Sequence, residues 1–208
     1  MSQSVIPSIP QNPLFAPHAA HLPPGLVYET GFLTMDEEAY WLGLVQGLTI
    51  EAMRYKAYTA KRRVISFGGQ YDVDDNQLVT TDGIPEAFHG LRQKVARWLG
   101  CDPAELVHML VAEYAPGTPL CWHRDMPNFE DTVGISLLSE ASMRFRPYSP
   151  VAPQKSDVIK LVLAPRSIYR LSGPSRWAWQ HSVAPPPALR YSITFRTAAA
   201  STAPALTG

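Results

Sequence analysis

Cysteine is scarce in this chain: Cys101 and Cys121 are the only two among 208 residues, and they do not form a CxxC pair. A CxxC pair is typical of zinc knuckles and of redox dithiols, so the sequence predicts neither kind of site. With so few thiols, a reduced, cytoplasmic setting is the simpler expectation.

Long hydrophobic runs are also missing. No stretch approaches the roughly 20 apolar residues that a membrane-spanning helix needs. The N-terminal residues lack the basic region and apolar run of a signal peptide. We therefore expect a cytoplasmic protein with no membrane partner and, by default, a monomer.

Net charge is absent as well, because 18 Lys and Arg residues balance 18 Asp and Glu residues. The totals give no overall attraction to nucleic acid, so any basic binding surface must be local. Two local groups could face phosphates, Lys61-Arg62-Arg63 and the pair Arg144 and Arg146. Each could equally be a solvated charged face.

Proline and periodicity divide the chain into three parts. Residues 1–24 contain six prolines and no sustained periodicity, which indicates an extended arm. Residues 198–208 are small and of mixed polarity, which is typical of a loose tail. The 173 residues between them, 25–197, suit one domain with a sizeable core.

The order of predicted elements points to an α+β fold. Thr34 followed by acidic residues predicts a helix to about residue 48, and apolar residues at helical spacing predict another over 85–99, stopped by Gly100. Short apolar runs between turns then predict strands at 106–111, 133–138, 142–145, 158–163, 167–171 and 191–196. Two helices followed by many strands favour a double-stranded β-helix of jelly-roll or cupin type, supported by the N-terminal helices.

The segment Trp122-His123-Arg124-Asp125 carries a candidate metal site. In an extended chain, His123 and Asp125 project to the same side, so both can reach one ion. His181 offers a second imidazole further along the chain. Two imidazoles and one carboxylate form the facial triad that leaves positions open on Fe(II) for a keto-acid and O2. Alone, HxD is a weak motif, and a lone His181 would be read as a core histidine.

The strand over 190–196 strengthens this interpretation. It alternates an apolar face with a polar face that carries both Arg190 and Arg196. A guanidinium can grip the distal carboxylate of 2-oxoglutarate through two hydrogen bonds. Either arginine alone would be read as a surface ion pair, but HxD, a later His and then Arg on the next strand form a four-part signal.

These ordered motifs resemble the AlkB family of Fe(II)- and 2-oxoglutarate-dependent dioxygenases, which act chiefly on alkylated nucleic acids. Residues 112–117 are similar to the strand and turn before HxD in that family, and residues 190–196 to its closing Arg-x-Asn-x-Thr-x-Arg strand. The resemblance covers most of residues 60–197. It implies an enzyme that uses Fe(II), 2-oxoglutarate and O2.

The resemblance also assigns expected roles around the co-substrate. Arg190 would bind the distal carboxylate and Arg196 would lie nearer the keto-acid end, with Ser192 between them; Tyr114 would contact 2-oxoglutarate or else be a core tyrosine. Two positions depart from the founding bacterial members: Ser192 and Ala112 replace asparagines. Co-substrate affinity or geometry could therefore differ.

Residues 61–71 are similar to the nucleotide-recognition lid of the family. Tyr71 is the candidate for contact with an extruded base, and Arg62, Arg63 and Arg144 are candidates for phosphates. Ordinary loop packing and solvation would explain the same residues equally well.

The expected function is oxidative demethylation of N-alkylated bases in DNA or RNA. Hydroxylation of an N-methyl carbon would release formaldehyde and restore the base, while 2-oxoglutarate would become succinate and CO2. Two alternatives remain open: the same chemistry on a protein or small molecule, and a non-catalytic nucleic-acid-binding module on the same fold. Complete metal ligands argue against the second.

Overall fold

The computed structural model describes residues 22–54, 59–68, 70–72, 77–79, 82–148, 154 and 157–199; of these, only the backbone is described at 53, 54, 59–61, 70–72 and 77–79. Most of the proline-rich arm, residues 1–21, and most of the tail, residues 200–208, lie outside the described residues. Both segments therefore stay predictions.

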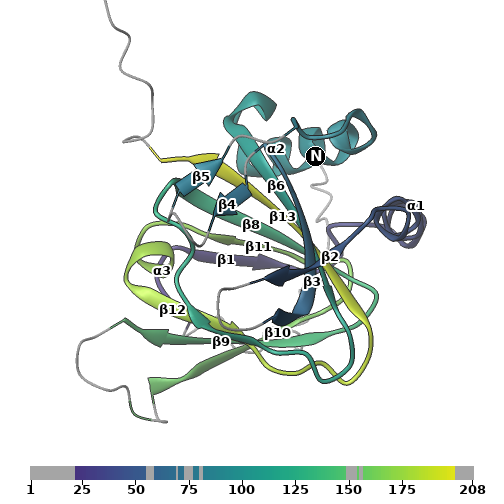
Figure 1. Ribbon diagram of the computed structural model, residues 1–208. Helices are drawn as coiled ribbons and strands as arrows, with labels where there is room; N and C mark the ends of the chain where they lie inside the picture. Colours follow the sequence, from purple (N-terminus) through teal and green to yellow (C-terminus); the bar gives the residue numbers. More distant parts are fainter. Residues whose placement is uncertain are drawn as a thin grey trace, which may run out of the picture.

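Antiparallel strands form two large sheets and one small hairpin (Figure 1). The seven-stranded sheet has the order β1 (Leu26–Glu29), β11 (Ile168–Leu171), β8 (Phe129–Leu137), β13 (Arg190–Ala198), β6 (Leu106–Tyr114), β3 (Thr59–Phe67) and β2 (Glu51–Arg54). The four-stranded sheet has the order β10 (Ile159–Leu163), β9 (Ala141–Pro147), β12 (Trp179–Val183) and β7 (Leu120–His123). The hairpin joins β4 (Gln70–Asp72) to β5 (Gln77–Val79). Each of the six predicted strands corresponds to one of these elements, although the ranges 133–138, 158–163 and 167–171 each extend one residue beyond the observed strand.

Both predicted helices are present. Helix α1 (Met35–Gln46) begins with a capping box, in which Thr34 Oγ1 accepts a hydrogen bond from Glu37 N at 3.1 Å and Glu37 Oε2 accepts one from Thr34 N at 2.8 Å. Helix α2 (His89–Leu99) follows the 3₁₀ turn η3 (Glu86–Phe88) and ends at Gly100. Short turns complete the set: η4 (Pro103–Glu105) and α3 (Pro174–Trp177). In the described part of the chain, none of the helices could cross a membrane.

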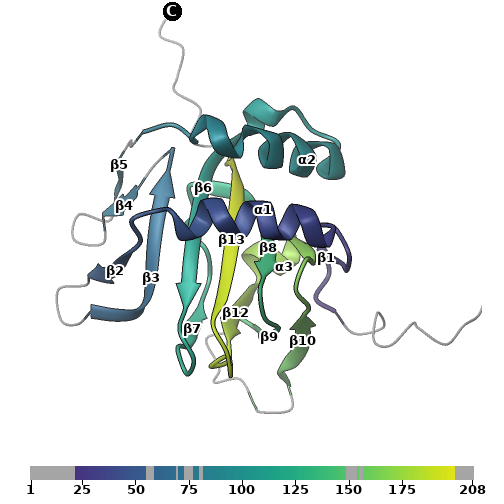
Figure 2. The same cartoon turned by 90° about the vertical axis from the view of Figure 1, so that its right-hand side faces the viewer.

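Helices α1 and α2 cover one face of the seven-stranded sheet, as Figure 2 shows from the side. Their apolar residues pack with the outward side chains of β6, β8 and β13 in one buried cluster, which includes Val45, Leu91, Met109, Ile135 and Ile193. A second, smaller cluster lies between the two sheets and includes Met143, Phe145, Leu163, Tyr169 and Leu171. The seven-stranded sheet is therefore buried on both faces.

Strand β13 is central to this arrangement because it is paired on both sides, with β6 and with β8. Its apolar residues face the helices, and its polar residues, Arg190 to Arg196, face the space between the sheets. The predicted polar face is thus an interior surface. The strand runs to Ala198, and Ala199 is buried with its N–H donating to Asn128 O at 3.0 Å, so ordered chain reaches into the segment expected to be a tail.

The segment resembling a nucleotide lid is divided between two structures. Strand β3 contains Arg62 and Arg63 and belongs to the seven-stranded sheet, where it pairs with β6. The chain leaves that sheet at Gly68, whose φ of +83° favours glycine, and the β4–β5 hairpin follows. Alternation alone did not predict β3, because its start is rich in charged residues.

A close contact inside the sheet sandwich involves Gly134 on β8 and Tyr169 on β11, which lie opposite each other. A Cβ atom at Gly134 would lie 2.3 Å from Tyr169 Cζ. Only glycine therefore leaves room for the tyrosine ring at this position.

We expect Gly134→Ala to lower the free energy of unfolding by about 1–3 kcal/mol, because the methyl group overpacks a rigid ring. Gly43→Ala is the matched control: this helical glycine has no atom within 4 Å of a Cβ, so alanine should stabilise by about 0.5–1 kcal/mol. Urea denaturation measures both. Adding Tyr169→Leu to the Gly134→Ala protein should restore part of the loss, and two glycine variants with equal midpoints would contradict the packing argument.

Candidate active site

Two histidines meet across the pairing of β7 with β12. His123 and His181 are direct partners in the antiparallel register, and their ring centroids lie 4.2 Å apart. Residues directly opposite each other share a face of the sheet. His181 is also the register partner of Phe145, which belongs to the cluster between the sheets, so both imidazoles face the interior.

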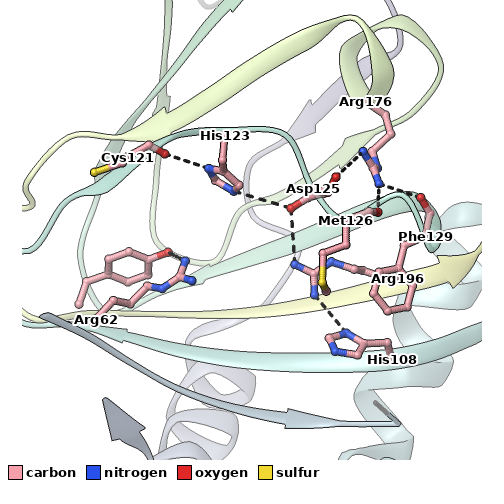
Figure 3. Close-up of polar contacts among 10 residues, drawn as sticks. Arg62, His108, Cys121, His123, Asp125, Met126, Phe129, Arg176 and Arg196 are labelled. Carbon is pink, nitrogen blue, oxygen red and sulfur yellow. Dashed lines mark hydrogen bonds and ion pairs between the residues drawn. The ribbon is translucent and has the colours of Figure 1, made fainter. Parts of the chain in front are cut away.

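Asp125 joins the histidines from the segment that follows β7. One ligand atom from each of His123, Asp125 and His181 lies within 4.8 Å of the others, which is close enough for all three to hold one metal ion. His123 Nδ1 donates to Cys121 O at 2.9 Å, so Nε2 is left with its lone pair toward Asp125 Oδ1, 3.8 Å away. Figure 3 shows His123 between Cys121 and Asp125.

The electrostatics of these groups suit a cation. Burial, as the largest cause, and the neighbouring His123 together lower the pKa of His181 to about 3. Burial by itself raises the pKa of Asp125, but the charge of Arg196 and other nearby cations holds it well below its usual range. The site thus presents two neutral imidazoles and one carboxylate, which are the protonation states that metal binding requires.

Arg176, on α3, fixes the backbone that carries Asp125 (Figure 3). Its guanidinium is buried and donates to three carbonyl oxygens: Asp125 O at 3.3 Å, Met126 O, and Phe129 O at 2.8 Å. Sequence reasoning missed this residue, because nothing in the local pattern tells which carbonyl groups a distant arginine will meet. We assign Arg176 a positioning role.

A second polar group surrounds Arg190, which is buried at the other end of the polar face of β13. Its Nε donates to Ser136 Oγ at 3.1 Å, and its Cζ lies 5.0 Å from the centroid of the Tyr114 ring. Arg62 Nη1 donates to the Tyr114 hydroxyl at 3.4 Å. Burial alone would raise the pKa of this hydroxyl, but Arg62 and Arg190 hold it below its ordinary value.

This second group is suited to an anion. Arg190 makes no ion pair with a carboxylate in the described residues, and its buried Nη1 has no hydrogen-bond partner there. A buried charge costs several kcal/mol unless it is paired. Ser192 also lies buried on this face and helps to lower the pKa of the Tyr114 hydroxyl.

Arg196 contacts the candidate metal site directly. Its Nη2 lies 3.6 Å from Asp125 Oδ1, and its Nη1 lies 3.1 Å from His108 Nδ1. No sequence motif singles out His108. The structure places it on β6 directly opposite Arg196, where it holds the guanidinium against Asp125 (Figure 3).

The tentative substrate residues are not gathered in one place. Arg63 Nε and Nη2 donate to Ile50 O at 3.0 and 2.7 Å, and Nη1 pairs with Glu113 at 2.9 Å, so the whole guanidinium is engaged within the protein. Arg62 reaches Tyr114, whereas Arg144 lies on the outer face of the four-stranded sheet. The side chain of Tyr71 lies outside the described residues.

Comparison with known proteins identifies the family. Residues 46–196 match the model of the 2OG-Fe(II) oxygenase superfamily. A Xenopus tropicalis protein named tRNA (carboxymethyluridine(34)-5-O)-methyltransferase alkbh8 is 27% identical over 178 residues, which cover 79% of this chain and 26% of that protein. The Arabidopsis thaliana Alkylated DNA repair protein ALKBH8 homolog is 30% identical over 182 residues, which cover 77% of this chain and 51% of that protein. The chain therefore spans between about a quarter and a half of these relatives.

Solved structures give the same fold. OsALKBH1 matches with a TM-score of 0.65 at 17% identity, covering 85% of this chain and 100% of that chain. A Trichoplax adhaerens prolyl hydroxylase in complex with a hypoxia inducible factor peptide matches with a TM-score of 0.58 at 17% identity, covering 84% and 83%. The double-stranded β-helix predicted from strand spacing is thus confirmed.

We expect Arg176→Leu to weaken binding of a divalent metal by about 10- to 100-fold, because the carbonyls around Asp125 lose their shared donor. The variant should also lose about 2–4 kcal/mol of stability, since three hydrogen bonds to a charged group disappear. Titration with Co(II), monitored by absorbance at a temperature below the melting transition of each variant, measures the affinity of the folded protein for the metal.

Arg166→Gln is the control, because Arg166 pairs with Glu38 at the surface and should change neither quantity by much. A lower melting temperature of Arg176→Leu with unchanged Co(II) affinity would contradict the positioning role.

Proposed function

Because the chain belongs to the 2OG-Fe(II) oxygenase superfamily and is AlkB-like within it, we propose that it oxidatively dealkylates N-alkylated bases of nucleic acid. That it is a dioxygenase using Fe(II), 2-oxoglutarate and O2 follows from the family. The dealkylation step and the nucleic-acid substrate are the proposal.

The dioxygenase chemistry on which the proposal depends is supported by the convergence of His123, Asp125 and His181 between the sheets. Asp125 Oδ2 is buried and has no hydrogen-bond partner in the described residues, although a buried carboxylate oxygen normally has one. A metal ion would satisfy it. Two imidazoles and one carboxylate are the donor set that suits Fe(II), so these residues fit the metal that the family uses.

The surroundings of Arg190 fit 2-oxoglutarate in the same way. Its unpartnered Nη1 would receive the distal carboxylate, while Ser136 keeps the guanidinium oriented through Nε. The Tyr114 hydroxyl lies beside it with a depressed pKa, which makes it a good hydrogen-bond donor to an anion. Arg196 would hold Asp125 in place and lie near the keto-acid end of the co-substrate.

Bound Fe(II) supplies one kind of chemistry: it couples oxidative decarboxylation of 2-oxoglutarate by O2 to hydroxylation of a C–H bond, with succinate and CO2 as products. The protein residues provide binding, orientation and a dry interior. A hydroxylated N-methyl carbon leaves its nitrogen as formaldehyde, which restores the unmodified base.

The nucleic-acid substrate is supported by the relatives, two of which are named for tRNA and for alkylated DNA repair. The chain matches only part of each, so the methyl transfer in the name of the Xenopus tropicalis protein is not assigned here. Arg62 supports the proposal from the structure, because its guanidinium lies at the Tyr114 end of the site, on the strand that leads to the β4–β5 hairpin.

The decisive assay supplies the purified protein with Fe(II), 2-oxoglutarate, air and an oligonucleotide that carries an N-methylated base. We expect succinate and formaldehyde in equal amounts, together with loss of the methyl group by mass spectrometry. Asp125→Ala should abolish all three signals, because one metal ligand is gone, while the Arg166→Gln protein should behave like the wild type.

Succinate without demethylation would retain the dioxygenase and redirect the substrate search to proteins or small molecules. Full turnover by Asp125→Ala would overturn the assignment of the metal ligands.

Arg190→Gln should raise the KM for 2-oxoglutarate by roughly two orders of magnitude, since loss of a buried charge pair costs about 2–5 kcal/mol. The Kd for Co(II) should change little, because Arg190 does not contact the three candidate ligands. Succinate formation over a range of 2-oxoglutarate concentrations measures the KM. An unchanged KM would move the carboxylate-binding role to another residue.

A further inference from the structure

The outer face of the four-stranded sheet carries a group of cations around one tryptophan. Trp122 precedes the inward His123 on β7, so its side chain points away from the interior. Arg144 and Arg146 precede and follow the inward Phe145 on β9, so their side chains also point outward. Arg144 Cζ lies 5.3 Å and Arg146 Cζ 4.4 Å from the centroid of the Trp122 ring. Both guanidiniums therefore share a single aromatic ring.

The two guanidiniums are held in place by β12, which lies between β9 and β7. Arg144 Nε donates to Ser182 Oγ at 3.0 Å, and Arg146 Nε donates to Gln180 Oε1 at 2.8 Å. Both anchors use Nε, and no hydrogen bond of the terminal nitrogens is present among the described residues, which leaves two oriented donor pairs there. A planar, oriented fork is well suited to phosphate oxygens.

Charge on this face is not balanced. Lys160 on β10 lies directly opposite Arg144, and like charges in that position destabilise a sheet. Among the described residues, no carboxylate lies within ion-pair distance of Arg144, Arg146 or Lys160, whereas Lys94, Arg166 and Arg170 elsewhere all have acidic partners. The arrangement costs stability unless an anion binds to it.

The same outer face carries a second arginine–aromatic pair. Arg124, which lies between the ligands His123 and Asp125 in the sequence, places its Cζ 3.8 Å from the centroid of the Tyr148 ring. Arg124 Nη1 donates to Trp177 O at 3.1 Å, so this second arginine–aromatic pair is also fixed. Tyr148 follows Arg146 by two residues and is 53% exposed.

We propose that this surface, defined by Trp122, Arg124, Arg144, Arg146, Tyr148 and Lys160, binds the sugar–phosphate backbone of single-stranded nucleic acid. Four cations would contact successive phosphates, and the exposed Tyr148 ring offers a face for base stacking. The inference rests on the proposed function, and it names the surface that would hold the strand beside the reacting base.

A single strand fits this surface better than an acidic protein segment does. Oriented guanidiniums interleaved with aromatic rings bind phosphates and bases together, whereas carboxylates would use only the charges. A duplex is a poorer fit, because its bases are stacked and cannot reach the aromatic rings.

The test measures binding directly, by fluorescence anisotropy of a short labelled single strand without alkyl groups, across a series of salt concentrations. The double variant Arg144→Gln/Arg146→Gln should weaken binding about tenfold near 0.1 M salt. It should also reduce the slope of log K against log salt by about 1.4, because two phosphate contacts are lost and each contributes about 0.7 in a single strand. Arg92→Gln/Arg97→Gln on α2 removes the same charge from the far side of the molecule and should bind like the wild type (Figure 1).

A third protein, Arg144→Lys/Arg146→Lys, keeps the charge and loses the fork, so we expect a retained salt slope with intermediate affinity. Thermal unfolding checks that each variant is folded. Equal binding by the wild type and the Arg144→Gln/Arg146→Gln protein, or an equal loss in the α2 control, would overturn the inference. Tighter binding of a labelled polyglutamate peptide than of the strand would assign the surface to an acidic protein instead.

The binding assay is independent of turnover. Normal strand binding without dealkylation would contradict the proposed function and leave this inference intact. Dealkylation by the wild type, together with unaffected strand binding by Arg144→Gln/Arg146→Gln, would support the proposed function and contradict this inference.

Discussion

The antiparallel register between β7 and β12 is the constraint on which the rest of the site depends. It sets His123 opposite His181 on the inner face of the four-stranded sheet. A slip of β7 by one residue would turn His123 to the outer face and bring Trp122 inside. The same alternation that directs the histidines inward directs Trp122 outward, so one register creates the candidate metal site and the cationic surface on opposite sides of a single strand.

Positive charge buried between the sheets is the second organising feature. Arg176, Arg190 and Arg196 are each nearly inaccessible to solvent, and each is held by carbonyl, hydroxyl or imidazole groups as well as by any charge nearby. Arg196 and Arg176 help to keep Asp125 ionised despite its burial, while burial keeps His181 neutral. Arg190 Nη1 has no hydrogen-bond partner among the described residues, so a carboxylate bound there would neutralise a buried positive charge.

The two faces of the seven-stranded sheet have different roles: one packs against the helices and the other lines the candidate active site. One face of β13 packs Ile193 and Phe195 against α1 and α2, and the other presents Arg190 and Arg196 to the site. Pairing with β6 on one side and β8 on the other holds the backbone of this strand in place. Arg190 and Arg196 are therefore placed on a strand whose backbone is hydrogen-bonded on both sides, and a rigid element of this kind suits a binding site.

The sequence by itself determined the local features: the capping box at Thr34, the stop at Gly100, the alternation of β13, and the two-residue spacing of His123 and Asp125. Each follows from neighbours a few residues apart, because helix caps and strand faces are set by short-range geometry. The pairing of β7 with β12 and the contacts of Arg176, His108 and Ser136 were decided only by the tertiary structure. These contacts join groups about 50 or more residues apart in the sequence. A long side chain could reach many partners, and which partner it contacts is decided only when the two sheets pack together around it.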